Sequence, residues 1–299
     1  MFDEIGQDIE ALFEGFEFSN TLRCSTVNNS GVRVTAEGIL SSSDENVSSL
    51  SMGQKKSPGS LVVENLSITN EGRVSGEFSV KFSGVSKLYL SAQDERSEPG
   101  RSIKSSGKIG AEYRSEILSM DTSIDVINGP TGRATFLYAY RPWNIKFGAN
   151  VQLNSHWDEV DNSKRGKVRG GGQGVEVEDI NFGLAYVTPG YQFHAKTSNY
   201  VASITLGYLH NVSAKMGFGA IIDYGFNTNS QNLVICGSYT LDEATHAKAK
   251  ISSSAQMAGT LEHKLNKNVT LRLSSGVDMK DAMIPAKFGI GLVFDAEES

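Results

Sequence analysis

The side chains that could carry chemistry are scattered through this sequence and lack the spacing of an active site. It contains no Gly-x-Ser-x-Gly motif and no cysteine–histidine signature. The glycine run at 170–174 is not followed by the Lys-Ser/Thr pair of a phosphate-binding loop. The histidines, which show no metal-ligand spacing, are His156, His194, His210, His246 and His263. We therefore expect no catalytic residue, metal site or cofactor.

The ionisable groups that do cluster are carboxylates in a predicted amphipathic helix, from residue 3 to about residue 15. An apolar stripe recurs at helical spacing: Ile5, Ile9, Leu12, Phe13 and Phe16. The remaining surface carries Asp3, Glu4, Asp8, Glu10 and Glu14. Gly15 is expected to end the helix. The stripe must be buried, either on the inner wall of a barrel, on a partner protein or on a membrane surface.

From Asn20 onward, segments of about ten residues alternate between apolar and polar positions, which predicts β-strands. In the clearest segment, residues 143–153, every odd position is apolar and every even position is polar or glycine. The same alternation occurs at 180–186, 212–222, 233–241 and 269–277. About nineteen strands fit the chain, and their length suits tilted strands with lipid on one face and an aqueous lumen on the other.

Composition agrees with this all-β prediction. The 299 residues carry a formal net charge of −6, which argues against nucleic-acid binding. No run approaches the roughly 18 apolar residues of a membrane helix. The N-terminus has neither the basic region nor the apolar core of a secretory signal, which favours a mitochondrial or plastid outer membrane over a bacterial one. Cys24 and Cys236 are expected to be buried or lipid-facing thiols.

Two segments interrupt the alternation. Residues 41–59 are rich in serine, and residues 154–178 contain the basic cluster Lys164–Arg169 and the glycine run. We predict that 154–178 is a long flexible loop. Its basic cluster is either simply solvated or meets anionic headgroups or a partner protein.

The last predicted strand, residues 285–294, would have to pair with the first strand in a closed barrel. It also carries a pattern of a polar residue, a glycine and two hydrophobic residues: Lys287, Gly289, Leu292 and Phe294. This pattern resembles the C-terminal β-signal that mitochondrial outer-membrane barrels present to their assembly machinery.

With these features together, the chain resembles the mitochondrial porins, the voltage-dependent anion channels. The similarity lies in the segments Phe2–Phe13 and Gly15–Phe18, in the turn Ile127–Pro130 and in residues 239–296. It implies a helix and hinge at 1–18 inside the pore, one nineteen-stranded barrel at 19–296 with parallel first and last strands, and a tail at 297–299. It also implies a voltage-gated diffusion channel for ions and small anionic metabolites such as ATP, ADP and phosphate, in the mitochondrial outer membrane. Membrane lipids, the assembly machinery and further copies or other membrane proteins would be its partners.

The chain departs from this family in charge. Family channels tend to be basic, whereas the predicted pore helix here is acidic, so we hypothesise weak anion preference or cation preference. Basic residues predicted to face the lumen would partly offset this: Lys146, Lys248, Lys250 and Arg272. The nucleotide-associated Gly-Leu-Lys motif of the family appears only with an insertion, in residues 84–88, which makes Lys87 a candidate nucleotide contact.

Three alternatives stay open at this point. A protein-translocating barrel of the same membrane would bind basic presequence peptides in its lumen. A plugged structural barrel would co-purify with other membrane proteins and would not conduct. A soluble β-protein would need no detergent.

Overall fold

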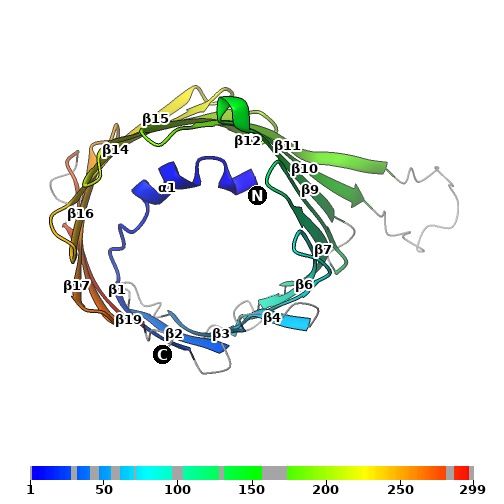
Figure 1. Cartoon of the computed structure of the whole chain (residues 1–299), viewed down its shortest axis with the longest axis horizontal. Coiled ribbons are helices and arrows are strands. Elements are labelled where there is room, and N and C mark those ends of the chain that lie inside the picture. The colour runs from blue at the N-terminus through cyan, green and yellow to red at the C-terminus, as the bar shows by residue number, and fades with distance from the viewer. Residues whose placement is uncertain are drawn as a thin grey trace, which may run out of the picture.

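The strands of the chain close into one barrel, with the N-terminal helix inside the ring (Figure 1). The computed structural model describes residues 2–27, 32–40, 47–54, 61–70, 72–95, 104–127, 131–156, 174–280 and 286–295. The strands are β1 (Asn20–Val27), β2 (Val32–Leu40), β3 (Val47–Gln54), β4 (Leu61–Thr69), β5 (Val74–Lys81), β6 (Ser86–Glu95), β7 (Lys104–Arg114), β8 (Leu118–Asp125), β9 (Thr131–Tyr140), β10 (Ile145–His156), β11 (Gly174–Val187), β12 (Tyr191–Ser198), β13 (Ser203–Ser213), β14 (Met216–Gly225), β15 (Ser230–Thr240), β16 (Thr245–Ser252), β17 (Gln256–Asn266), β18 (Val269–Asp278) and β19 (Lys287–Asp295).

Closure depends on the pairing of the first and last strands. Every consecutive pair is antiparallel, whereas β1 and β19 run parallel, with Thr21 opposite Gly291 and Ser25 opposite Asp295. An odd number of strands in an up-and-down order requires one parallel pair, so the seam follows from the strand count. The nineteen-stranded transmembrane barrel with an internal helix, predicted from alternation and resemblance, is confirmed.

The two faces of the wall differ in polarity. On β10 and β11 the register places Phe147 opposite Leu184, and these side chains are 45% and 41% exposed on the outer face. The alternate row pairs Asn150 with Asn181, and both are buried on the inner face. Outward apolar and inward polar rows are the arrangement that a strand needs between lipid and water. No helix in the described ranges is both long enough and apolar enough to cross a bilayer.

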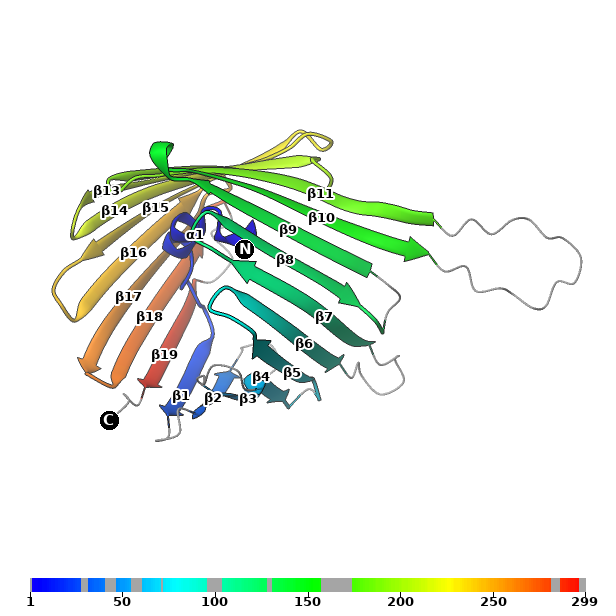
Figure 2. The same cartoon turned by 45° about the vertical axis from the view of Figure 1, so that its right-hand side comes forward.

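The N-terminal segment folds as a 3₁₀ turn, η1 (Phe2–Glu4), followed by α1 (Gln7–Phe13). Both figures show it inside the barrel (Figures 1 and 2). The helix ends at Phe13, because Glu14 already has extended backbone angles. The predicted helix end at Gly15 was therefore two residues too late.

Four other sequence predictions were wrong in detail. The serine-rich segment 41–59 contains β3, and residues 154–156 and 174–178 of the predicted loop belong to β10 and β11. The basic cluster Lys164–Arg169 lies outside the described residues. The alternation at 212–222 runs through a turn at 214–215, which separates β13 from β14. Trp143 lies in a 3₁₀ turn, η2 (Arg141–Trp143), and not in the strand that follows.

Candidate functional site

The candidate site is the lumen where the N-terminal segment lies on the barrel wall. Its apolar stripe is buried in two clusters. Phe2 and Ile5 pack with Leu137 and Ala185 of β9 and β11. The second cluster joins the helix to β13 and β15 and comprises Ile9, Leu12, Leu209 and Cys236, with Phe13, Phe16 and Ile221 partly buried against it. The structure thus places the five predicted stripe residues against the inner wall.

Glycines in the wall allow this close approach. A Cβ atom on Gly148 would lie 2.5 Å from Ile5 Cδ1, and one on Gly183 would lie 2.7 Å from the same atom. On β14, a Cβ on Gly219 would lie 2.7 Å from Leu12 Cδ2. The lumen-facing glycines of β10, β11 and β14 therefore form the surface on which the helix rests.

The turn into the helix is fixed by Gly6 and by His194 of β12. Gly6 has a φ of +78°, a left-handed conformation that residues with a side chain rarely adopt. A Cβ there would lie 2.0 Å from His194 Nδ1, and a Cβ on Gly207 would lie 2.3 Å from His194 Cε1. The imidazole is fully buried between these two glycines, and neither of its nitrogens has a hydrogen-bond partner among the residues that the structure describes. His194 acts here as a packing residue.

We expect Gly6→Ala to weaken the docking of the helix. The left-handed conformation costs a residue with a Cβ about 1–2 kcal/mol, and the new methyl group would also overlap the His194 ring. Docking can be followed by the reaction of the buried Cys236 with a water-soluble thiol reagent, in a Cys24→Ser background. Gly38→Ala is the matched control, because a Cβ on Gly38 meets nothing within 4 Å. Equal Cys236 labelling rates in Gly6→Ala and Gly38→Ala would contradict the role of Gly6 in docking the helix.

Polar contacts hold the acidic side of the segment. Lys196 Nζ of β12 lies 2.6 Å from Glu10 Oε1, and Gln192 Nε2 donates to Asp8 Oδ2 at 3.0 Å. Arg114 Nη2 of β7 lies 3.2 Å from Glu4 Oε1. Arg272 of β18 lies 3.2 Å from Glu17 Oε1 and 2.8 Å from Glu262 Oε1. Three of the carboxylates of the N-terminal segment are therefore neutralised by the wall.

The C-terminal end of α1 meets donors from the wall. Lys248 Nζ donates to the Ala11 carbonyl at 3.1 Å, and Lys250 Nζ donates to the Phe13 carbonyl at 3.4 Å. Lys250 also lies 4.2 Å above the Phe16 ring. Cations at this end complement the helix dipole and satisfy carbonyls that have no partner within the helix.

Removing one partner of the Lys196–Glu10 pair should loosen the helix modestly. The Lys196 side chain is 13% exposed and that of Glu10 is 39% exposed, so water screens the pair. We expect a coupling free energy of about 0.5–1 kcal/mol between Lys196→Gln and Glu10→Gln. A double-mutant cycle on the Cys236 labelling rate measures it. A coupling indistinguishable from zero would show that the pair does not hold the helix.

The remaining charged residues predicted for the lumen are Asp3, Asp8, Glu14 and Lys146. Asp3, Asp8 and Glu14 have no cationic partner in the part of the chain that the structure describes. Lys146 shares the inner face of β10 with Gly148 and Asn150. Among the described residues, the N-terminal segment thus presents three uncompensated carboxylates to the lumen.

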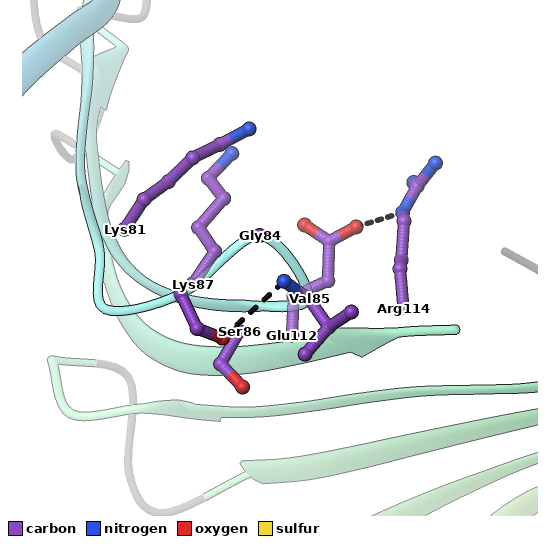
Figure 3. Close-up of a pocket in the computed structure, with 8 residues that line it drawn as sticks. Lys81, Gly84, Val85, Ser86, Lys87, Glu112 and Arg114 are labelled. Atoms are coloured by element: carbon purple, nitrogen blue, oxygen red, sulfur yellow. Dashed lines mark hydrogen bonds and ion pairs between the residues drawn. The ribbon is translucent and has the colours of Figure 1, made fainter. Parts of the chain in front are cut away.

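Lys87 lies in a cavity of about 280 Å³ near the turn between β5 and β6 (Figure 3). Lys81 and Arg114 line it as well, but Arg114 forms an ion pair with Glu112. The Lys87 ammonium lies 3.2 Å from Glu64 Oε1 and 3.9 Å from Glu77 Oε1. A phosphate group would have to compete with these carboxylates, so this cavity is less cationic than its lysines suggest.

The predicted assembly signal lies on both faces of β19. Lys287 and Gly289 occupy inward positions, and a Cβ on Gly289 would lie 2.4 Å from the Glu17 carbonyl oxygen. Leu292 and Phe294 alternate with them and share the outer row with the exposed Phe288 and Ile290. The role of these residues in assembly stays a prediction.

Several residues of the site were not singled out from the sequence. Lys196, Gln192 and Arg114 bind the helix, while Gly6 and His194 shape its turn. Strand alternation could have placed Lys196 and Gln192 on one face of β12. Their partners could not be found, because the position of the helix along the wall is set by tertiary packing.

Comparisons with known proteins agree with this architecture. Residues 173–289 match the family model described as eukaryotic porin. The chain is 23% identical to the voltage-dependent anion-selective channel of Drosophila melanogaster, over 64% of this chain and 61% of that protein. It is 20% identical to the mitochondrial outer membrane protein porin 6 of Oryza sativa subsp. japonica, over 95% of this chain and 93% of that protein.

The fold also has a counterpart among solved structures. A mutant of the Rh. blastica porin aligns over 93% of this chain and 97% of that chain, with a TM-score of 0.51 and 8% identity. At this identity the likeness concerns the barrel alone. The family match, the relatives that align along the chain and the closed barrel with an internal N-terminal helix lead to one conclusion. The chain is similar to the mitochondrial porins in sequence and in barrel architecture.

Proposed function

We propose that the chain is a passive diffusion channel for ions and small metabolites across the mitochondrial outer membrane. The observation that carries the proposal is the position of the N-terminal segment. It lies along the wall on the side of β9 to β16 (Figure 1) and is held there by the two apolar clusters. A helix docked on the wall narrows the lumen and places fixed charges in it.

The charges of the helix favour cations. Asp3, Asp8 and Glu14 have no cationic partner within the described ranges, whereas Arg114, Lys196 and Arg272 are each paired with carboxylates. Fixed carboxylates in a narrow lumen raise the local concentration of cations. We propose weak cation preference, with Lys146, Lys248 and Lys250 limiting its size. Voltage gating and nucleotide contact by Lys87 are part of the proposal, and they rest on the resemblance to the voltage-dependent relatives.

The test is single-channel recording of the refolded protein in a planar bilayer. We expect a large conductance that falls at high voltage of either sign, and release of ATP from liposomes that contain the protein. Lys87→Gln should slow this release relative to that of potassium. Folded protein that does not conduct would contradict the proposal and would favour the plugged structural barrel.

A further inference from the structure

A second cavity lies in the lumen, on the wall formed by β15 to β19. It has a volume of about 440 Å³ and is bounded on one side by Phe18, in the linker between α1 and β1. Pockets that hold small organic ligands measure about 300–1,000 Å³. None of the predicted functions of the chain uses this cavity as a binding site.

The linker that bounds the cavity is firmly seated. A Cβ on Gly276 would lie 2.7 Å from the Phe18 ring, so the ring rests directly on the backbone of β18. The next residue back, Glu17, pairs with Arg272 at 3.2 Å, and its carbonyl lies on Gly289. The aromatic side of the cavity is therefore a fixed surface, and it exists only when the linker is docked.

The charges in the cavity favour an anion. Lys250 and Lys287 both line it, and Asp278 is the one carboxylate among the described lining residues. Lys250 also donates to the Phe13 carbonyl at 3.4 Å, a neutral partner that leaves its positive charge in the cavity. Asp278 is already engaged, since it accepts from Gln256 Nε2 at 3.4 Å and from the Lys280 amide at 3.0 Å. Lys287 has no ion-pair partner among the residues that the structure describes. Unlike Lys87, it is free to bind a phosphate.

The neutral side chains of the cavity suit a hydroxylated ligand. Asn232 Oδ1 accepts from Ser253 Oγ at 3.3 Å, which leaves the Asn232 amide nitrogen free to donate. The hydroxyls of Ser252 and Ser254 bond to each other and offer further donors and acceptors. The Phe18 ring, which also lines the cavity, offers an apolar face for the C–H groups of a sugar ring.

We propose that this cavity binds a small sugar phosphate. The phosphate lies between Lys250 and Lys287, the sugar hydroxyls meet Asn232 and Ser252, and the apolar face of the sugar lies on Phe18. The inference rests on the proposed channel function only for the route by which the ligand reaches the lumen. Binding itself needs a folded barrel with its linker docked.

The test is a titration of the refolded protein, in detergent micelles, with glucose 6-phosphate. Binding is monitored by calorimetry or by the NMR chemical shifts of the protein. We expect saturable binding. Lys287→Gln should lower the affinity about tenfold, because it removes one charge-assisted hydrogen bond to the phosphate. Phe18→Ala should weaken it several-fold. Lys264→Gln is the matched control, because it removes one lysine of the same barrel wall that does not line the cavity.

Three outcomes would overturn the assignment. The first is the absence of saturable binding of glucose 6-phosphate. The second is an equal loss of affinity in Lys287→Gln and Lys264→Gln. The third is an equal affinity of the protein for inorganic phosphate and for glucose 6-phosphate. The measurement does not require conduction. A barrel that binds the sugar phosphate with the expected variant pattern but does not conduct would refute the channel and leave this site standing.

Discussion

Replacing both Ile5 and Ile9 with aspartate is expected to release the N-terminal segment from the wall. The two side chains are 0% and 1% exposed, and burying each contributes about 1.5–3 kcal/mol. A carboxylate at either position would in addition lose its hydration against Gly148, Gly183 or Leu209. The total exceeds about 3 kcal/mol, which corresponds to a more than hundredfold change in the docking equilibrium.

Cys236 reports this release directly. Its thiol is fully buried beneath the helix, where it donates to the Leu12 carbonyl at 3.3 Å. In a Cys24→Ser background, a water-soluble thiol reagent should modify Cys236 at least about a hundredfold faster in the double variant. Ala11→Asp is the control, because it adds a carboxylate to an exposed position of the same helix. Rapid labelling in the unmodified protein would show that the helix is not docked.

Neutralising the three uncompensated carboxylates should change the ion preference most. Asp3→Asn, Asp8→Asn and Glu14→Gln remove charges that have no cationic partner in the described chain, so no ion pair is broken. Within a Debye length of about 8 Å at physiological ionic strength, each charge contributes to the potential along the pore. The permeability ratio of potassium to chloride should fall at least about twofold in the triple variant.

Glu243→Gln is the control for this series, because it removes one carboxylate from the exposed turn between β15 and β16, outside the lumen. Its permeability ratio should equal that of the unmodified protein. A triple variant that also keeps the unmodified ratio would mean that the wall, and not the helix, sets selectivity.

The barrel could be predicted from sequence because its strands obey a simple rule. A strand between lipid and water must alternate, and residues 143–153, 180–186 and 269–277 do so clearly. The rule fails where a turn keeps the alternation in phase, as at 214–215 between β13 and β14. It also fails in β3, where Ser48, Ser49 and Ser51 around Leu50 weaken the contrast between the faces.

The site could be predicted only in part. The apolar stripe of the helix followed from its spacing, and its burial followed from the need to hide it. The ion pair between Glu10 and Lys196 joins residues far apart in sequence, and it depends on where the helix lies along the wall. The glycines under Ile5 had no signal of their own, because glycine is common at many positions of this barrel.

The reversal potential of single channels under a KCl gradient tests the central claim most directly. The claim is that an acidic helix, docked in the lumen, sets the charge preference of a passive channel. It predicts a reversal potential displaced toward the equilibrium potential of potassium, at neutral pH and low ionic strength, where screening is weakest. A reversal potential displaced toward that of chloride would contradict it.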